Sequence, residues 1–290
     1  MFTAAQRAEP GVLYVVATPL GNLRDITLRA LDILASVDLV AAEDTRTTLK
    51  LFNFYGLKGP KLVAYHEHNE ARKAPELIAA LKAQKSVALV SEAGTPAISD
   101  PGAHLVRLAH EEGIPVRPVP GPSALTCALS VSGFDLKGGF VFLGFLPARA
   151  TAKRRLLKDL AQERRPFLFF EAPHRLKDTL AALLEVLGDR TVFLAREMTK
   201  VFEEYLVSRL SALKNRFEEE EPRGEFTLLV AGKEEEPAPL NEVEKALEAA
   251  LSSGKTLKEA VSEVRKKYGG PKKEIYQLAL KLKQSQPEDV

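Results

Sequence analysis

Small, hydroxyl-bearing and acidic residues gather in one segment of the chain, Ser91–Gly102, which reads Ser-Glu-Ala-Gly-Thr-Pro-Ala-Ile-Ser-Asp-Pro-Gly. Gly94 and Ala97 would let a ligand approach the main chain closely, and exposed amides there could hold a carboxylate. Asp100 could also cap a following helix that has Pro101 at its first position. A structural loop rarely needs this combination, so the segment predicts a small-molecule site.

This segment needs a scaffold that positions it. In the first 120 residues, short apolar runs alternate with stretches of helical periodicity, which predicts a parallel sheet covered by helices on both faces. Ligands bind such sheets outside the carboxyl ends of the strands. Ala17–Thr27 follows the first expected strand and Ser91–Gly102 the fourth, although Ala17–Thr27 alone could simply be a well-made turn. We expect strands at 12–17, 39–42, 61–64, 87–90 and 115–118, and helices at 26–37, 45–53, 70–83 and 104–112.

The proline-rich segment Pro118–Pro122 can continue neither a helix nor a strand, so it marks a domain junction. Beyond it, closer strand spacing predicts a mixed sheet with an antiparallel portion. A Glu- and Pro-rich linker, Lys233–Pro239, precedes three amphipathic helices. The expected fold class is therefore α/β, with two α/β domains at 1–119 and 120–233 and a small C-terminal helical domain at 234–290. Strands are expected at 140–145, 167–170, 191–196, 203–208 and 224–231, and helices at 152–163, 175–187, 242–252, 257–268 and 272–283, with a further short helix between the strands 203–208 and 224–231.

The charges of the chain are segregated, although its net charge is only +2. Nine basic residues face three acidic ones between Arg149 and Lys177, and the same count recurs between Lys255 and Lys283. A polyanionic partner would meet two local basic fields. The alternative is that both stretches are solvated helix faces.

Several classes of protein are disfavoured by composition. Cys127 is the single cysteine, which excludes an internal disulfide and a thiolate-rich zinc site and fits a reducing cytosol. No apolar run reaches the ~18–20 residues of a membrane span, and the polar start Met1–Pro10 is no secretory signal. Dinucleotide and P-loop glycine signatures are missing. We expect a cytoplasmic protein with no membrane partner.

Six motifs stand in the order found in one known family: Thr18–Thr27, Ala42–Arg46, Ser91–Gly102, Pro120–Ala124, Phe170–Arg175 and Gly224–Val230. Over nearly its whole length the chain resembles the tetrapyrrole-methylase superfamily, and within it the 2′-O-ribose methyltransferases of small-subunit ribosomal RNA. Ala172 departs from the pattern, because a serine is expected there.

The resemblance implies S-adenosylmethionine bound in a cleft between two α/β domains and methyl transfer to a cytidine 2′-hydroxyl. It also implies a homodimer whose appended helical domain docks on ribosomal RNA or on the assembled small ribosomal subunit. No metal is expected: His66 and His68 could form a metal pair, but a third ligand is not evident. The residues that the resemblance and the chemistry assign to the cofactor are Pro19, Gly94, Thr95, Ile98, Asp100, Ser123, Ala124 and Ala172.

Methylating a ribose hydroxyl requires removal of a proton, so a general base could assist. We favour Glu43 and Asp44, which follow the second expected strand at the ligand edge, although Asp44 could equally be the N-cap of a helix starting at Thr45. The other candidates are His66, His68, Asp100, Glu171 and Glu197.

Cations beside the motifs could meet RNA phosphates. The candidates are Arg24, Arg46, Lys153, Arg154, Arg175 and Lys200. Lys266, Lys267, Lys272 and Lys273, with Tyr268 and Tyr276, give the C-terminal helices the character of a nucleic-acid module, although the tyrosines could belong to the core. Two other functions stay open: a precorrin C-methyltransferase, and a non-catalytic RNA-binding protein of ribosome assembly.

Overall fold

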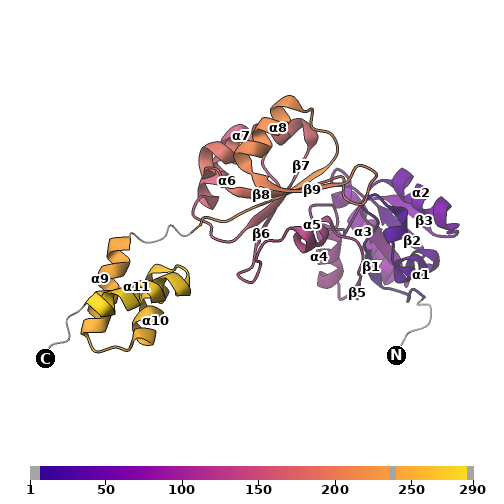
Figure 1. Ribbon diagram of the computed structural model, residues 1–290. Coiled ribbons are helices and arrows are strands. Elements are labelled where there is room, and N and C mark those ends of the chain that lie inside the picture. The colour runs from indigo at the N-terminus through magenta and orange to yellow at the C-terminus, as the bar shows by residue number, and fades with distance from the viewer. Residues whose placement is uncertain (1–6, 235–239, 286–290) are drawn as a thin grey trace. The chain divides into compact units, whose positions relative to one another are not determined.

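The computed structural model describes residues 7–234 and 240–285 (Figure 1). The chain divides into two compact units, a main unit of residues 1–232 and a helical unit of residues 233–290. Within the main unit, we call residues 7–119 the first lobe and residues 120–232 the second lobe, because each contains one sheet. None of the described helices has the length and apolar composition that crossing a bilayer requires.

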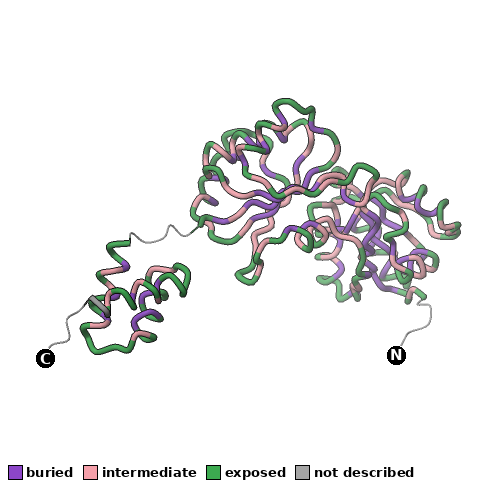
Figure 2. Tube along the Cα trace, in the orientation of Figure 1, coloured by how far each residue is buried: buried purple, intermediate pink, exposed green. Residues whose placement is uncertain are grey.

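The first lobe is built on a five-stranded sheet whose order is β3-β2-β4-β1-β5 and whose pairs are all parallel. This confirms the parallel sheet expected from the sequence. The three central strands, β1, β2 and β4, are largely buried between two apolar layers, one with α1 and α2 and the other with α3 and α4, and they are mostly purple in Figure 2. The edge strands β3 and β5 are more exposed. The elements are β1 (Leu13–Val16), α1 (Leu28–Ser36), β2 (Leu39–Ala42), α2 (Thr45–Tyr55), β3 (Lys61–Ala64), α3 (Glu70–Lys82), β4 (Val87–Val90), α4 (Ala103–Glu111) and β5 (Val116–Val119).

The second lobe contains a mixed sheet of order β6-β7-β10-β8-β9. β6 and β7 are parallel, and every other neighbouring pair is antiparallel, which confirms the expected antiparallel portion. Helices α6, α7 and α8 pack on one face and α5 on the other. The elements are α5 (Ala124–Val131), β6 (Val141–Phe145), α6 (Ala150–Leu160), β7 (Phe167–Glu171), α7 (Pro173–Leu187), β8 (Thr191–Arg196), β9 (Glu204–Arg209), α8 (Leu210–Glu219) and β10 (Phe226–Val230).

One helix was not expected from the sequence, and one expected helix cap is wrong. The sequence analysis placed only a junction at Pro118–Pro122, whereas α5 begins directly after it, with Ser123 as its N-cap. Asp100 was expected to cap the helix after Ser91–Gly102. The cap of α4 is instead Gly102, whose φ of 140° is unfavourable for a residue with a side chain. The Asp100 side chain is therefore left for another role.

The helical unit consists of α9 (Leu240–Ser252), α10 (Leu257–Tyr268) and α11 (Lys272–Ser285) around its own apolar core. Thr256 and Glu259 form a capping box that starts α10. Gly269, at a φ of 71°, ends the helix.

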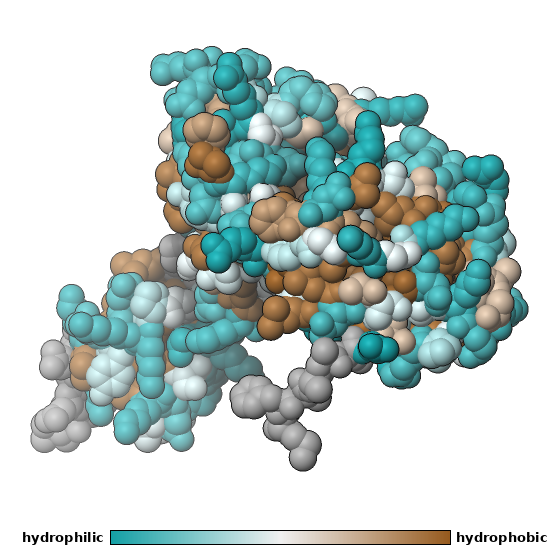
Figure 3. Space-filling model, turned by 90° about the vertical axis from the view of Figure 1, so that its right-hand side faces the viewer, coloured by the Kyte–Doolittle hydropathy of each residue, from teal (hydrophilic) through white to brown (hydrophobic). Residues whose placement is uncertain are grey.

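The surface in view in Figure 3 is mostly hydrophilic, and apolar residues reach it in patches.

Candidate functional site

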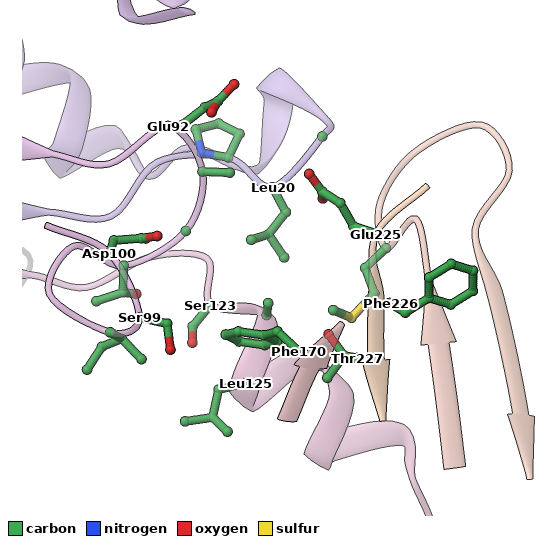
Figure 4. Close-up of a pocket in the computed structure, with 18 of the residues that line it drawn as sticks. Leu20, Glu92, Ser99, Asp100, Ser123, Leu125, Phe170, Glu225, Phe226 and Thr227 are labelled. Carbon is green, nitrogen blue, oxygen red and sulfur yellow. The ribbon is translucent and has the colours of Figure 1, made fainter. Parts of the chain in front are cut away.

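A cavity of about 670 Å³ opens between the two lobes of the main unit, within the ~300–1,000 Å³ typical of small-molecule sites. Figure 4 shows Glu92, Ser99 and Asp100 on the side of the first lobe, and Phe170 and Thr227 on the opposite side. The structure brings all eight residues assigned to a cofactor from the sequence to this one pocket: Pro19, Gly94, Thr95, Ile98, Asp100, Ser123, Ala124 and Ala172.

The loops after β1 and β4 are tied to each other at the floor of the pocket. Thr18 and Gly94 exchange two main-chain hydrogen bonds, of 2.8 and 2.9 Å, and the Thr18 hydroxyl donates to the Ser91 carbonyl at 3.3 Å. These loops meet because β1 and β4 are neighbours in the sheet and both end at the same edge. Ala97 and Ser99 have φ values of 67° and 65°, so the loop holds strained backbone of the kind found at ligand sites.

The second lobe supplies an apolar wall. Phe145 and Phe170 contact edge to face, with ring centroids 5.7 Å apart, and both line the pocket with Leu125, Met198 and Phe226. The sequence analysis assigned none of these five residues. Leu125 directly follows the motif Pro120–Ala124, and Phe226 lies within the motif Gly224–Val230, so those motifs carried a signal that was not read to single residues.

Three carboxylates line the pocket from the first lobe. Glu43, Glu92 and Asp100 all line the pocket, and the Glu92 amide donates to Glu43 Oε2 at 3.1 Å. Burial, with the nearby charges of Glu43 and Glu92, raises the pKa of Asp100 to about 6, against a hydrogen bond with Ser91 that lowers it. Asp100 therefore takes up a proton at a higher pH than an ordinary aspartate does.

Asp44 has a different environment from its neighbour Glu43. Its side chain caps α2 by accepting from the Arg46 amide at 2.7 Å and also binds the Arg46 guanidinium. The hydrogen bonds from Arg46 lower the pKa of Asp44 to about 2. Asp44 is not among the residues that line the pocket, so this geometry favours the capping role that the sequence left open and makes Asp44 a weak proton acceptor.

The six cations proposed to meet RNA are not brought together. Only Lys200 lines the pocket, and its ammonium binds Glu197 at 2.9 Å and Glu225 at 3.1 Å. Arg46 is bound to Asp44, and Arg154 binds Glu185 at 2.7 Å. Arg24 is exposed next to the pocket, in the short helix Leu23–Asp25.

Lys153 and Arg175 belong to an internal network. The Lys153 ammonium donates to the Thr179 hydroxyl at 2.7 Å, which donates to Glu171 Oε2 at 2.6 Å. Arg175 pairs with Glu171 Oε1 at 3.2 Å and also donates to the Leu146 carbonyl. Lys153 and Glu171 are buried, and burial lowers the pKa of Lys153 despite the opposing charge of Glu171. The expectation that Lys153 contacts RNA phosphates is not supported by this burial.

The network lies directly behind the pocket. Glu171 also accepts from the Ala172 amide at 3.0 Å, and Glu171, Ala172 and Pro173 all line the cavity. Ala172 is the N-cap of α7 and has no side chain able to cap it, which is the structural consequence of the serine missing from the motif. The position of this wall therefore depends on Glu171.

The remaining candidate bases lie elsewhere. The rings of His66 and His68 are 5.9 Å apart, and His68 contacts Glu67 at 3.4 Å. Among the described residues, no group of three or more histidine, cysteine or acidic side chains could hold a metal. Glu197 pairs with Lys200 and accepts from the Glu225 amide at 2.9 Å.

The structure is that of a two-lobed α/β protein with a ligand pocket at the carboxyl ends of β1 and β4. Comparison with known families leads to the same class of protein. The family model described as "Tetrapyrrole (Corrin/Porphyrin) Methylases" matches residues 12–214, and the "RsmI C-terminal HTH domain" matches residues 237–283. The chain therefore belongs to the tetrapyrrole methylase family.

Two curated relatives of the chain have the same name. The chain is 51% identical over 224 residues to "Ribosomal RNA small subunit methyltransferase I" of Thermotoga maritima, covering 77% of this chain and all of the relative. The protein of the same name from Bacillus subtilis is 42% identical over 277 residues, covering 93% of this chain and 94% of the relative.

Solved structures share the fold. A cobalt precorrin-4 methyltransferase superposes with a TM-score of 0.57 at 19% identity, covering 76% of this chain and 95% of the other. A uroporphyrin-III C-methyltransferase from Thermus thermophilus, complexed with S-adenosyl homocysteine, has a TM-score of 0.53 at 20% identity, covering 75% of this chain and 96% of the other.

Proposed function

We propose that this chain transfers a methyl group from S-adenosylmethionine to ribosomal RNA of the small subunit, at the ribose 2′-hydroxyl of a cytidine. The observation that carries the proposal is the convergence of eight motif residues on one interlobe pocket. Relatives that carry the rRNA methyltransferase name match almost the whole chain, including the helical unit in the case of Bacillus subtilis.

The pocket fits the methyl donor by its chemistry. Adenine needs an apolar wall, and Leu125, Phe145 and Phe170 supply one. A carboxylate tail needs main-chain donors, and Gly94 and its neighbours present backbone at the pocket floor. A Cβ at Gly94 would lie 3.2 Å from Leu20 Cδ2, and its φ is 80°, so glycine keeps this approach open. Acidic side chains provide oxygen acceptors for a sulfonium cation.

When bound, S-adenosylmethionine supplies an already activated methyl group, so the protein's task is mainly positioning. The tied loops after β1 and β4 give the binding groups fixed places. Among the carboxylates, we propose Glu43 and Asp100 as the pair that holds the proton leaving the hydroxyl. Asp100 has a pKa of about 6, which suits proton transfer at neutral pH better than that of Asp44.

We propose that the protein acts as a homodimer. β9 is an edge strand of the second sheet, and Tyr205 and Val207 point to the face on which α5 packs, opposite Ala195 and Phe193. Both side chains are exposed, as is Val131 at the end of α5. An apolar sheet face beside an open edge is suited to a second copy of the chain.

The cytoplasm, where ribosomal RNA is found, is the proposed location.

The decisive experiment supplies methyl-labelled donor with protein-free small-subunit RNA, assembled small subunits, or a porphyrinoid precursor. Label recovered in a 2′-O-methylcytidine after nuclease digestion supports the proposal. Label in the porphyrinoid would reassign the chain to the precorrin methyltransferases, and no label with retained RNA binding would make it a non-catalytic assembly protein. Comparison of the two RNA forms identifies the substrate.

A further inference from the structure

The helical unit has a basic groove between α10 and α11, with a volume of about 910 Å³. Four cations line it: Lys258, Arg265 and Lys266 from α10, and Lys272 from α11. Among the described residues that line the groove there is no carboxylate. The groove is therefore a concentrated positive surface of the helical unit.

Among the described residues of the helical unit, these four cations have no acidic partner. Within residues 240–285, the structure gives none of them an ion pair, because the acidic residues of α10 are engaged elsewhere. Glu259 caps its own helix through Thr256, and Glu263 pairs with Lys255. Clustered like charges repel one another, and an anion bound in the groove would relieve that repulsion.

Helix α9 has a net negative charge, opposite to that of the groove. Glu242, Glu244 and Glu248 stand on this helix against the single cation Lys245. The helical unit therefore has an acidic helix and a basic groove between its other two helices. A polyanion would be repelled from α9 and attracted to α10 and α11, so the charges specify which side of the unit meets it.

Two glycines contribute main chain to the lining of the groove. Gly269 and Gly270 line it with φ values of 71° and 88°, and a Cβ at Gly270 would lie 3.4 Å from Ile275 Cδ1. Tyr276 lies beside them and is partly buried. Val261 is the other apolar residue of the lining and is buried. The groove thus offers charge and polar surface but no large exposed apolar anchor of the kind that protein interfaces use.

We infer that this groove binds the ribose–phosphate backbone of the RNA substrate, with Lys258, Arg265, Lys266 and Lys272 as its phosphate contacts. The inference rests on the proposed function for the identity of the RNA. Backbone contacts carry no sequence information, so the groove holds the substrate while the main unit selects the nucleotide.

The test compares two double variants of the full-length protein, Lys266→Gln with Lys272→Gln and Lys267→Gln with Lys273→Gln. The second pair is the matched control, because each lysine is the next residue on the same helix, is exposed, and does not line the groove. Dissociation constants for protein-free small-subunit RNA are measured by fluorescence anisotropy across a salt series, without methyl donor. Calorimetric titration with S-adenosylmethionine verifies the main unit of each variant, and circular dichroism verifies the helices.

The groove variant is expected to bind RNA about tenfold more weakly at 0.1 M salt, with a slope of log K against log salt reduced by about 1.4 for two lost contacts. The control should change by less than half as much, and donor affinity should stay the same in both. Equal effects of the two pairs, or an unchanged slope, would overturn the inference.

Loss of binding only to assembled subunits, and not to free RNA, would also overturn it, because the groove would then contact ribosomal protein. Absence of methyl transfer by the wild-type chain would instead contradict the proposed function. It would leave the comparison of the RNA dissociation constants standing.

Discussion

Two stretches of this chain have the same charge in the sequence but differ in the structure. Arg149–Lys177 and Lys255–Lys283 each contain nine basic and three acidic residues. In the first, most cations have partners: Arg154 pairs with Glu185, Arg165 with Glu163, Arg175 with Glu171 and Lys177 with Glu221, while Lys153 is buried. In the second, the four cations of the groove have none among the described residues of their unit.

The difference teaches that charge counts do not measure the charge available to a ligand. A cation paired with a carboxylate contributes little net charge toward a phosphate, because the opposite charge lies beside it. The acids that neutralise Arg154 and Lys177, namely Glu185 and Glu221, lie outside the stretch in the sequence. In the helical unit, three acids stand on α9, Glu259 caps α10 and Glu263 pairs with Lys255, and no carboxylate lines the groove among the described residues.

The strongest test of this contrast is to break the internal network. Glu171→Gln should lower the free energy of unfolding by about 3–5 kcal/mol, because Lys153 and Arg175 would lose their carboxylate in a buried setting. Arg154→Gln, which breaks an exposed pair, should cost at most about 1 kcal/mol. Urea denaturation followed by circular dichroism measures both. Equal costs would contradict the distinction between buried and surface cations.

Asp100→Asn tests whether the buried carboxylate of Asp100 destabilises the folded protein when it is ionised. The pKa of Asp100 in the folded protein, about 6, lies above its ordinary 3.8. The native state therefore binds more protons between these values, and the Asp100 contribution to stability falls as pH rises from about 4 to about 6. Above pH 6 the Asn variant should be more stable than wild type, by up to about 3 kcal/mol.

The same substitution should reduce turnover. Wild-type activity is expected to fall as pH drops through about 6, where Asp100 takes up a proton. Asp100→Asn should lower kcat by about 10²–10⁴ and remove this limb of the profile if the carboxylate accepts the proton. Thermal unfolding and single-turnover rates from pH 5 to 9 check both predictions. A wild-type rate in the variant would exclude Asp100 as the acceptor.

The salt dependence of RNA binding gives a smaller but sharper comparison. Lys266→Gln alone should reduce the slope of log K against log salt by about 0.7, the value for one single-stranded phosphate contact. Arg154→Gln should leave the slope unchanged, because Arg154 is occupied by Glu185. Anisotropy titrations at four salt concentrations separate the two. A reduced slope for Arg154→Gln would show that the second lobe contacts RNA as well.

The smallest effect is expected for Asp44→Asn. Asparagine retains a side-chain oxygen for the cap of α2, and Asp44 lies outside the pocket, so kcat at saturating donor should stay within about twofold of wild type. Glu43→Gln, one residue earlier but lining the pocket, is the paired comparison. Steady-state kinetics measure both, and a large loss in Asp44→Asn would restore it as a base candidate.

Much of the fold could be predicted because its strands are continuous apolar runs. β2, β3, β4 and β8 have the expected bounds. β2, β4 and β8 are largely buried, and a strand buried on both faces is a continuous apolar run in the sequence. α5 was missed because the prolines of 118–122 dominate its neighbourhood, and its small residues Ala124, Thr126 and Ser130 show little helical periodicity.

The pocket could be predicted in part because its motifs follow strand ends that the parallel topology brings together. Phe145 and Met198 could not be found this way, because nothing local distinguishes them from core residues. The sequence also could not predict which charged side chains are paired or buried and which are exposed. Lys153 and Lys266 both lie in basic stretches of the sequence. Lys153 donates to Thr179, which donates to Glu171, whereas Lys266 lines an open groove.

The central position of β10 in the second sheet has a consequence for biosynthesis. β10 is the last strand among the described residues, yet it joins β7 to β8 and contributes Phe226 and Thr227 to the pocket. A nascent chain that ends before residue 226 has two unjoined strand pairs with open edges. The first lobe can fold early during translation, but the donor site is completed only when Phe226–Val230 leaves the exit tunnel.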